Sequence, residues 1–231
     1  MSKTCKSLVG FFVLCFGLTL ANAQAPDDLD SFFRAVTDGR GDRTRSLLAS
    51  HPDWVNRELF SGIRPLYRAA TLGRPEVTQI LLENGANVGA KTEHGSLPLH
   101  AASQNGHLAV VLLLLASRSD VNASNEYGET ALHLAARYKR VKVMTELLRN
   151  GAEPDLLDGK GRTALHYAAG LGNSAMVTSL AGAKAKLDLV DSSGFSPLGW
   201  ALELKRNSYQ DVARFLRAQG CKDVHPEPVE P

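Results

Sequence analysis

The sequence predicts an all-α fold, a solenoid of about six stacked helix-turn-helix units joined by hairpin-like turns. The first observation is a series of glycines, Gly62, Gly95, Gly128, Gly161 and Gly194, each 33 residues after the one before. The second is a string that follows each glycine, read in turn as RPLYRAA, LPLHAAS, TALHLAA, TALHYAA and SPLGWAL. The third is an apolar segment with helical spacing later in each unit, such as EVTQILLENGA. A fixed period of this length is typical of stacked supersecondary units.

Residues 1–23 have the composition of a secretory signal. Two lysines precede an almost wholly apolar run from Leu8 to Leu20, and the segment ends in Ala21-Asn22-Ala23, a pattern that signal peptidases accept. The run is shorter than the about 20 apolar residues of a membrane-spanning helix. The residues before Cys15 are not the small ones of a lipoprotein signal, and no arginine pair precedes the run. We therefore expect a cleaved signal peptide, export of an unfolded chain, and no membrane anchor in the mature protein.

Removal of this segment changes both the charge and the cysteine content. Two of the 26 basic residues leave with it, so the mature chain keeps 24 basic and 24 acidic residues and carries no formal net charge. Bulk electrostatics then favour neither nucleic acid nor an anionic membrane as a partner. Cys5 and Cys15 also leave, and Cys221 alone cannot form an internal disulfide. The fold is therefore expected to depend on packing, and pairing of Cys221 with another chain stays open.

The units follow a short linker at residues 24–29. A degenerate first unit spans 30–61, where Phe32, Ala35 and the pair Leu47-Leu48 hold the core positions between charged residues. The next units span 62–94, 95–127, 128–160 and 161–193. The last, 194–221, has a two-residue insertion between its helices and a more polar face, so both end units suit caps. Residues 222–231 are rich in proline and are predicted to form a flexible tail.

The first helix of each unit is expected to begin just after the repeated glycine. Thr130, Thr163 and Ser196 are good N-cap residues, and the prolines at 65, 98 and 197 suit the first helical position. The second helix is expected to end at Gly85 or Gly151, where glycine adopts the left-handed cap at low cost.

The segment between one unit and the next is polar and turn-forming. Asn125, Asp158 and Asp191 stand at the same place in successive turns, and the side chains of these residue types stabilise turns through local hydrogen bonds.

These repeats resemble the ankyrin repeat family. The family pattern is a turn, G-x-TPLHxAA, a second helix ending in LLxxGA, and a following DVN; HLAVVLLLLASRSDVNA at 107–123 and EVTQILLENGANV at 76–88 match it almost position by position. The resemblance covers about residues 30–221. It implies an ankyrin-repeat solenoid, an L-shaped stack of antiparallel helix pairs whose turns project from one edge. It also implies a protein partner bound by the turn tips and the exposed, concave face of the first helices.

A histidine recurs once per unit, at His100, His133 and His166. These side chains cannot share a metal ion, because packed helices lie about 8–10 Å apart and zinc needs each ligand atom within about 2.1 Å. The resemblance implies instead a structural histidine that hydrogen-bonds to the neighbouring turn. His94 and His107 have no acid or cysteine at ligand spacing and are interpreted as ordinary polar residues. The chain has no phosphate-binding loop, serine-nucleophile motif or paired-cysteine motif, so we expect no catalytic residue, metal or cofactor.

The expected partner-binding face follows from the resemblance, position by position. Tyr127, Arg137 and Tyr138 form its expected centre, because tyrosine and arginine dominate binding hot spots. For Tyr138, packing against the next unit is the alternative. The remaining positions of the face are Glu93, His94, Ser96, Gln104, Asn105, Glu126, Glu129, Lys160, Arg162, Leu171 and Phe195.

A second surface feature comes from comparing the units with one another. The segment LAVVLLLLA, residues 108–116, is apolar throughout, whereas an amphipathic helix keeps a polar stripe. Ala109, Leu112 and Ala116 stand where the neighbouring units have charged or polar residues, so they are expected on the outer, convex face. Leu112 then belongs to a second contact, such as a self-association site, or is covered by flanking side chains.

Three functional classes follow in order of preference. The first is a non-catalytic protein-binding module in the periplasm or the secreted space, acting as an accessory, protective or inhibitory partner of another exported protein such as a stress enzyme or a toxin. The second is a self-associating structural scaffold, with Leu112 as its only sign; a monomer or weak self-association is expected. An enzyme comes last, because the repeat framework uses almost every residue.

Overall fold

The computed structural model describes residues 28–58, 61–203 and 207–224. The predicted signal peptide, most of the predicted linker and residues 225–231 of the predicted tail lie outside the described residues. Within them, the chain forms twelve α-helices, one 3-10 helix and an isolated β-bridge between Ser124 and Thr130. The prediction of an all-α solenoid is confirmed. None of the helices in this part of the chain combines the length and apolar character needed to cross a membrane.

Two sets of helices alternate along the chain. The first helices of the six units are α1 (Leu29–Asp38), α3 (Pro65–Leu72), α5 (Pro98–Asn105), α7 (Ala131–Arg137), α9 (Ala164–Gly170) and α11 (Pro197–Glu203). The second helices are α2 (Gly41–Ser50), α4 (Pro75–Glu83), α6 (Leu108–Ala116), α8 (Val141–Arg149), α10 (Ser174–Gly182) and α12 (Asn207–Ala218). A 3-10 helix, η1 (Pro52–Asn56), follows α2.

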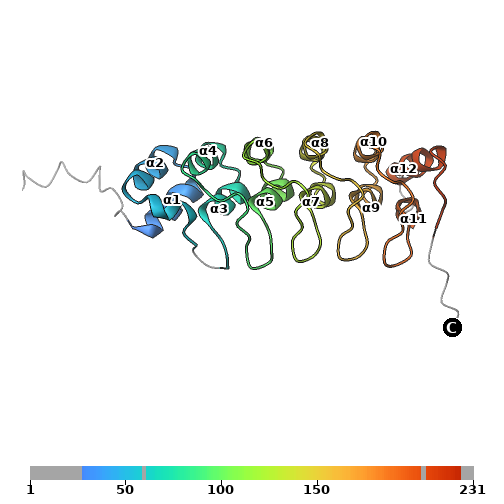
Figure 1. Cartoon of the computed structure of the whole chain (residues 1–231). Helices are drawn as coiled ribbons and strands as arrows, with labels where there is room; N and C mark the ends of the chain where they lie inside the picture. The colour runs from blue at the N-terminus through green and yellow to red at the C-terminus, as the bar shows by residue number, and fades with distance from the viewer. Residues whose placement is uncertain (1–27, 59–60, 204–206, 225–231) are drawn as a thin grey trace, which may run out of the picture.

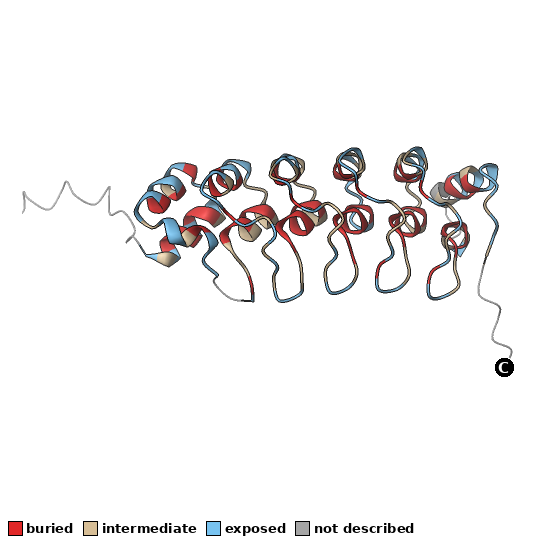
Figure 2. Ribbon diagram, viewed as in Figure 1, coloured by how far each residue is buried: buried red, intermediate tan, exposed pale blue. Residues whose placement is uncertain are grey.

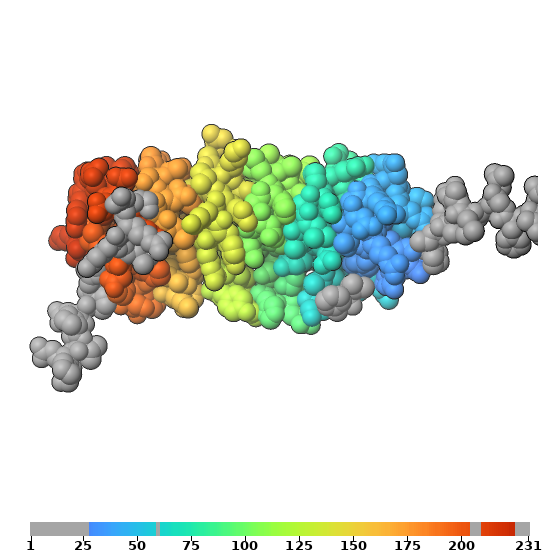
Figure 3. Space-filling view, turned by 180° about the vertical axis from the view of Figure 1, so that it is seen from behind, coloured from blue at the N-terminus to red at the C-terminus, as the bar shows by residue number. Residues whose placement is uncertain are grey.

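The helices stack in two parallel rows, with the turns projecting beyond the row of first helices (Figure 1). Each first helix contacts the first helix of the next unit, and each second helix contacts the next second helix. In the space-filling view the units follow one another as bands across an elongated body (Figure 3). A binding surface on this body is therefore extended along several units.

The core lies between the two rows, where buried residues face one another (Figure 2). One leucine occupies the same position of the second helix in five consecutive units, and each is at most 2% exposed; the five are Leu48, Leu81, Leu114, Leu147 and Leu180. Burying a leucine side chain stabilises a fold by about 1.5–3 kcal/mol. Paired alanines such as Ala135 and Ala136 are fully buried on the first helices, so neighbouring first helices pack closely.

The predicted helix ends agree with the structure. Thr130 and Thr163 are the N-cap residues of α7 and α9, and prolines begin α3, α5 and α11. Gly85 and Gly151 follow α4 and α8 with φ of 83° and 87°. The corresponding residues after α6 and α10 are Arg118 and Lys184, which adopt a left-handed φ of 61° without being glycine.

The C-terminal unit ends differently from the internal ones. Its first helix carries Gly199 where the three preceding units carry histidine. The backbone N–H of Ser196 donates to the carbonyl oxygen of Val224 at 3.2 Å, and the Ser196 hydroxyl donates to that of Lys222 at 3.4 Å. Residues 222–224, which the sequence assigned to the tail, thus lie against the start of α11 and close the stack.

Candidate functional site

The tips of successive turns, residues 92–96, 125–129, 158–162 and 191–195, are joined by backbone hydrogen bonds. In each tip an N–H donates to a carbonyl oxygen at the equivalent place in the preceding turn. The donor and acceptor pairs are Glu93 to Ser61 (3.1 Å), Glu126 to His94 (3.1 Å), Gly159 to Tyr127 (2.8 Å) and Ser192 to Lys160 (3.0 Å). The tips therefore form one continuous edge that presents its side chains at a fixed spacing.

Each tip is also shaped by one side chain within it. Oδ1 of Asn125, Asp158 and Asp191 accepts two backbone N–H groups, two and four residues later, at 2.8–3.0 Å. These are the turn residues predicted from the sequence. Because the same bonds recur in these three turns, their tip backbones have the same local support.

The repeated histidines tie each unit to the next turn. Nε2 of His133 lies 3.0 Å from the carbonyl oxygen of Arg162, and Nε2 of His166 lies 3.2 Å from that of Phe195. Since a carbonyl only accepts, Nε2 carries the proton, and Nδ1 accepts the N–H of Thr130 or Thr163 at 3.0–3.1 Å. His100 repeats the arrangement, with its Nε2 near the carbonyls of Ala123 and Glu129. The structural role implied by the family resemblance is confirmed.

Burial keeps these histidines neutral. Desolvation lowers the pKa of His100, His133 and His166 below the ordinary 6.5, and it outweighs the opposing effect of the backbone carbonyls that each Nε2 contacts. A neutral ring suits the geometry, because one nitrogen must donate and the other must accept.

Two aromatic residues that sequence reasoning did not place in the site brace the tips from the first helices. The hydroxyl of Tyr167 donates to Oδ2 of Asp158 at 2.6 Å, and Nε1 of Trp200 donates to Oδ2 of Asp191 at 3.0 Å. Each aromatic residue stands nine residues after its carboxylate, in consecutive units. That shared offset is the signal from which the pairing could have been found.

Arg162 lies inside this braced region. Its guanidinium contacts Oδ2 of Asp158 at 3.0 Å and lies 4.7 Å from the ring centre of Tyr167 and 6.0 Å from that of Trp200. Only 16% of its side chain is exposed. Arg162 therefore fixes the tip of its own unit and offers a partner little free surface.

The charge of Asp158 follows from these contacts. Burial by itself raises the pKa of this carboxyl, but hydrogen bonds from the Tyr167 hydroxyl, from the backbone N–H groups of Arg162 and Lys160, and from the Arg162 guanidinium bring the pKa below the ordinary 3.8. The same burial, with Asp158 beside it, raises the pKa of the Tyr167 hydroxyl. Tyr167 thus stays protonated and Asp158 ionised at neutral pH, which keeps the brace intact.

Among the turn residues that the structure describes, Tyr127 is the most exposed aromatic residue. Its surface is 59% exposed, and its ring centre lies 6.5 Å from that of His94 in the preceding tip. Nδ1 of His94 lies 2.5 Å from a carboxylate oxygen of Glu126. Hydrogen bonding with Glu126 raises the pKa of the Tyr127 hydroxyl. Three of the predicted contact residues therefore gather on two adjacent tips and face solvent.

Arg137 and Tyr138 lie at the other end of the first helix. A guanidinium nitrogen of Arg137 donates to Oε1 of Glu129 at 2.7 Å, and the Glu129 side chain is only 8% exposed. The Arg137 guanidinium also lies 5.7 Å from the ring centre of Tyr138, which is itself 40% exposed. Glu129 thus holds Arg137 in place, and Tyr138 keeps a large part of its surface open to solvent.

The other predicted contact residues differ in exposure. Glu93 and Lys160 are exposed, whereas Ser96, Gln104, Asn105, Leu171 and Phe195 are half-buried. The amide nitrogen of Asn105 donates to the carbonyl oxygen of Ala101 at 2.9 Å, so this side chain caps its own helix. The exposed members therefore cluster on the tips and around the loop between α7 and α8.

The outer face carries the second predicted feature. Leu112 of α6 is 44% exposed, and Ala109 and Ala116 are exposed beside it. Flanking side chains therefore leave this leucine open. Leu157 and Val190, at equivalent places in two successive turns, are also exposed.

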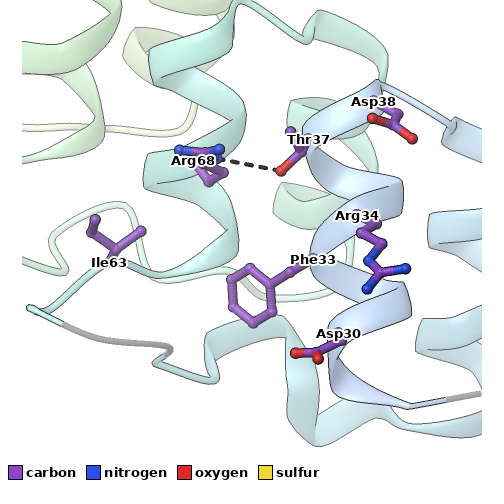
Figure 4. A pocket seen from close by; sticks show the side chains of 7 residues that line it. All are labelled: Asp30, Phe33, Arg34, Thr37, Asp38, Ile63 and Arg68. Atoms are coloured by element: carbon purple, nitrogen blue, oxygen red, sulfur yellow. Dashed lines mark hydrogen bonds between the residues drawn. The ribbon is translucent and has the colours of Figure 1, made fainter.

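A hollow of about 420 Å³ lies at the N-terminal end of the stack, between α1 and α3 (Figure 4). Its lining includes Phe33, charged residues of α1 and Arg68, whose Nε donates to the Thr37 hydroxyl at 3.3 Å. The described residues contain no group of three or more side chains placed to hold a metal ion.

Three family models match the chain and together cover residues 61–226. The models describe an ankyrin repeat at 61–93, ankyrin repeats in many copies at 81–135, and ankyrin repeats in three copies at 132–226. The chain therefore belongs to the ankyrin repeat proteins. Such repeats generally mediate protein–protein interaction, and no catalytic family is indicated. A search of curated proteins found no match.

Proposed function

We propose that the mature protein is a non-catalytic binding module that holds one protein partner against its tips and first helices. Ankyrin repeats supply the general basis for a protein partner. The observation that carries the proposal is the pair of exposed tyrosines, Tyr127 and Tyr138, at 59% and 40% exposure, one in the tip that precedes α7 and one directly after α7. Exposed tyrosines on a fixed backbone lose little side-chain freedom on binding and supply large contact areas.

The rigidity of the tips supports this assignment. Hydrogen bonds from tip to tip and from Asn125 within its own tip hold the backbone beneath Tyr127 before any partner arrives. Such preorganisation lowers the entropic cost of association. The contact centre thus consists of His94, Glu126 and Tyr127 on the tips, with Arg137 and Tyr138 at the end of α7.

The compartment is part of the same proposal. The signal-like segment at residues 1–23 supports our proposal that the mature protein acts in the periplasm or the secreted space. The partner is then another exported protein, for which this module acts as an accessory, protective or inhibitory subunit. A stress enzyme and a toxin are the two kinds of partner that we consider first.

Affinity capture from the natural compartment tests this function. Tagged mature protein is compared with a Tyr127→Ala/Tyr138→Ala variant; Arg137 is left intact because its loss would strand the buried carboxylate of Glu129. We expect one heterologous protein to be captured by the wild type and lost by the double variant, with both proteins folded. Equal capture by both proteins would place the contact elsewhere on the solenoid.

Self-association is a second candidate, because Leu112 is exposed on the outer face together with Ala109 and Ala116. A Leu112→Lys variant should then dissociate any concentration-dependent oligomer seen by analytical ultracentrifugation. A mature protein that stays monomeric at all concentrations would remove this candidate, since single exposed leucines are common on protein surfaces.

A further inference from the structure

The loop between α7 and α8, together with the helix ends beside it, carries a dense group of positive charges. Arg137, Lys139, Arg140 and Lys142 fall within six residues, and all four are exposed. We call this group the basic edge. It is local, because the mature chain has equal numbers of basic and acidic residues.

The surroundings of the basic edge are almost uncharged. The flanking helices α5, α6, α9 and α10 contain no lysine, arginine, aspartate or glutamate. The histidines of α5 and α9 are buried. His107, in the loop before α6, directs Nε2 at the carbonyl oxygen of Thr71 at 3.1 Å. The flanking helices therefore provide no carboxylate that would neutralise the edge.

The acidic residues nearest to the basic edge along the chain already have partners. Glu129 pairs with Arg137 at 2.7 Å, and Glu146 pairs with Arg149 at 2.5 Å. Within the part of the chain that the structure describes, no carboxylate lies within ion-pair distance of Lys139, Arg140 or Lys142. Three positive charges are thus left for an external anion, and they lie close enough for their fields to add at physiological salt.

Comparison between units shows which basic residues the repeat fold uses and which it does not require. Arg140 is framework: its Nε donates to the carbonyl oxygen of Gln104 at 3.0 Å, as Nε of Arg74 donates to that of Thr37 at 3.0 Å. Lys142 stands where the two preceding units have Glu76 and Ala109. Packing of the repeat therefore does not require a lysine at this position.

Lys139 is the least expected member of the basic edge. Its backbone has φ of 59°, whereas the equivalent residues of four other units, Gly39, Gly73, Gly106 and Gly172, are glycines with positive φ. A non-glycine residue in this conformation costs about 1–2 kcal/mol. No ion pair or hydrogen bond of the Lys139 side chain within the described residues offsets that cost. The fold therefore does not require a lysine at this position.

The basic edge also has a receptive shape. A hollow of about 300 Å³ is lined by Gly106 of the preceding unit and by residues 139–143, so two lysines, an arginine and the half-buried Val141 contribute to it. A segment seated there meets both charge and apolar surface. Tyr138, 40% exposed, borders the same loop.

We propose that the basic edge docks an acidic segment of the protein partner. The inference rests on the proposed function, which makes the partner a protein, and it adds the chemistry of the segment that the partner presents. Carboxylates of this segment lie against Lys139, Arg140 and Lys142, and an adjoining part of the partner reaches Tyr138. Charge complementarity of this kind selects a partner and speeds association.

A pair of charge-matched variants tests the inference. Lys139→Glu/Lys142→Glu reverses the basic edge and keeps a non-glycine residue at the strained position. The control, Arg118→Glu/Lys184→Glu, makes the same change in net charge at two exposed positions with φ of 61°. The probe is a short fluorescent peptide of alternating glutamate and glycine, followed by anisotropy at about physiological salt.

We expect the wild type to bind the peptide, the Lys139/Lys142 variant to bind it about tenfold or more weakly, and the control to bind within about twofold of wild type. Equal weakening of both variants, or of neither, would overturn the inference, as would absence of binding by the wild type. Displacement of the peptide by an equally charged oligonucleotide or by anionic vesicles at the same concentration would overturn its assignment to a protein segment.

The outcomes also distinguish the two proposals. If the Lys139→Glu/Lys142→Glu variant and the Arg118→Glu/Lys184→Glu control both retain a captured partner, the binding-module function stands and the proposal of an acidic docking segment is wrong. Peptide binding that follows the expected pattern, with no heterologous partner captured, would support the basic edge and contradict the proposed function.

Discussion

Nε2 of His133 donates to the carbonyl oxygen of Arg162, one unit further along, at 3.0 Å. The same imidazole accepts the N–H of Thr130 through Nδ1 at 3.1 Å. One buried side chain thus joins the start of its own helix to the tip of the next turn. Because His100 and His166 repeat this connection, three tips are fixed to the helix stack by the same device.

His133→Ala should destabilise the fold by about 1–3 kcal/mol, since it leaves the buried N–H of Thr130 without a partner and removes one of the two hydrogen bonds that the Arg162 carbonyl accepts. Urea unfolding followed by circular dichroism measures this change. His94→Ala is the control, because His94 lies on an exposed tip, and it should change stability by less than about 0.5 kcal/mol. Similar effects of the two substitutions would contradict the structural role of His133.

Stability should fall as the pH drops below about 6.5. The pKa of His100, His133 and His166 is lowered in the fold from the ordinary 6.5, chiefly by burial. Below that value the unfolded chain binds protons that the folded chain does not, so the free energy of unfolding decreases with decreasing pH. Above it, the contribution is fully present.

Urea midpoints at about pH 7.5 and about pH 5.5 test this dependence. A His133→Gln variant should lose less stability over the same interval, because it has one fewer buried imidazole. Stability that is constant or that rises toward acid would show that these rings are not kept neutral by the fold.

Tyr167→Phe should destabilise the protein by about 1–2 kcal/mol, because it removes the 2.6 Å hydrogen bond to the ionised carboxylate of Asp158. Thermal unfolding provides the measurement. Tyr138→Phe, at an exposed position, serves as the matched control and should leave the midpoint unchanged. The brace between helix and tip would be refuted by equal midpoints for Tyr167→Phe and the wild type.

Lys139→Gly should stabilise the fold by about 0.5–1 kcal/mol. It relieves the positive φ of 59°, and the entropy of the added glycine in the unfolded chain offsets part of the gain. Chemical unfolding checks the sign, with Lys142→Gly as a control that should destabilise α8. Loss of stability in Lys139→Gly would indicate that the lysine side chain makes a contact important for folding.

The repeat period predicted the helix pairs because the apolar side chains at equivalent positions must pack against the next unit. The spacing of these residues therefore indicates which side chains are buried. The turn residues Asn125, Asp158 and Asp191 were predictable for the same reason, since their hydrogen bonds are local. The tip positions of Glu129 and Arg162 look exposed in an alignment of units, yet their side chains are 8% and 16% exposed. Their burial depends on Arg137, Tyr167 and Trp200, whose directions a linear pattern does not give.

His107 illustrates the same limit. Its sequence context indicates an ordinary polar residue, whereas its Nε2 lies 3.1 Å from the carbonyl oxygen of Thr71 in the preceding unit. Arg74 and Arg140 make equivalent contacts at the ends of their neighbouring first helices. Because histidine and arginine alternate at this place, the shared role becomes visible only when the units are stacked.

The measurement that tests the central claim most directly is the affinity of the mature protein for its captured partner, determined by calorimetry for three matched proteins. Wild type, Tyr127→Ala/Tyr138→Ala and Leu112→Lys are compared after their unfolding midpoints are shown to agree. If the partner binds the tips and the first helices, the double tyrosine variant should lose affinity by about a hundredfold or more, and Leu112→Lys should lose none. Unchanged affinity in the tyrosine variant, with loss in Leu112→Lys, would contradict the account and move the contact to the outer face.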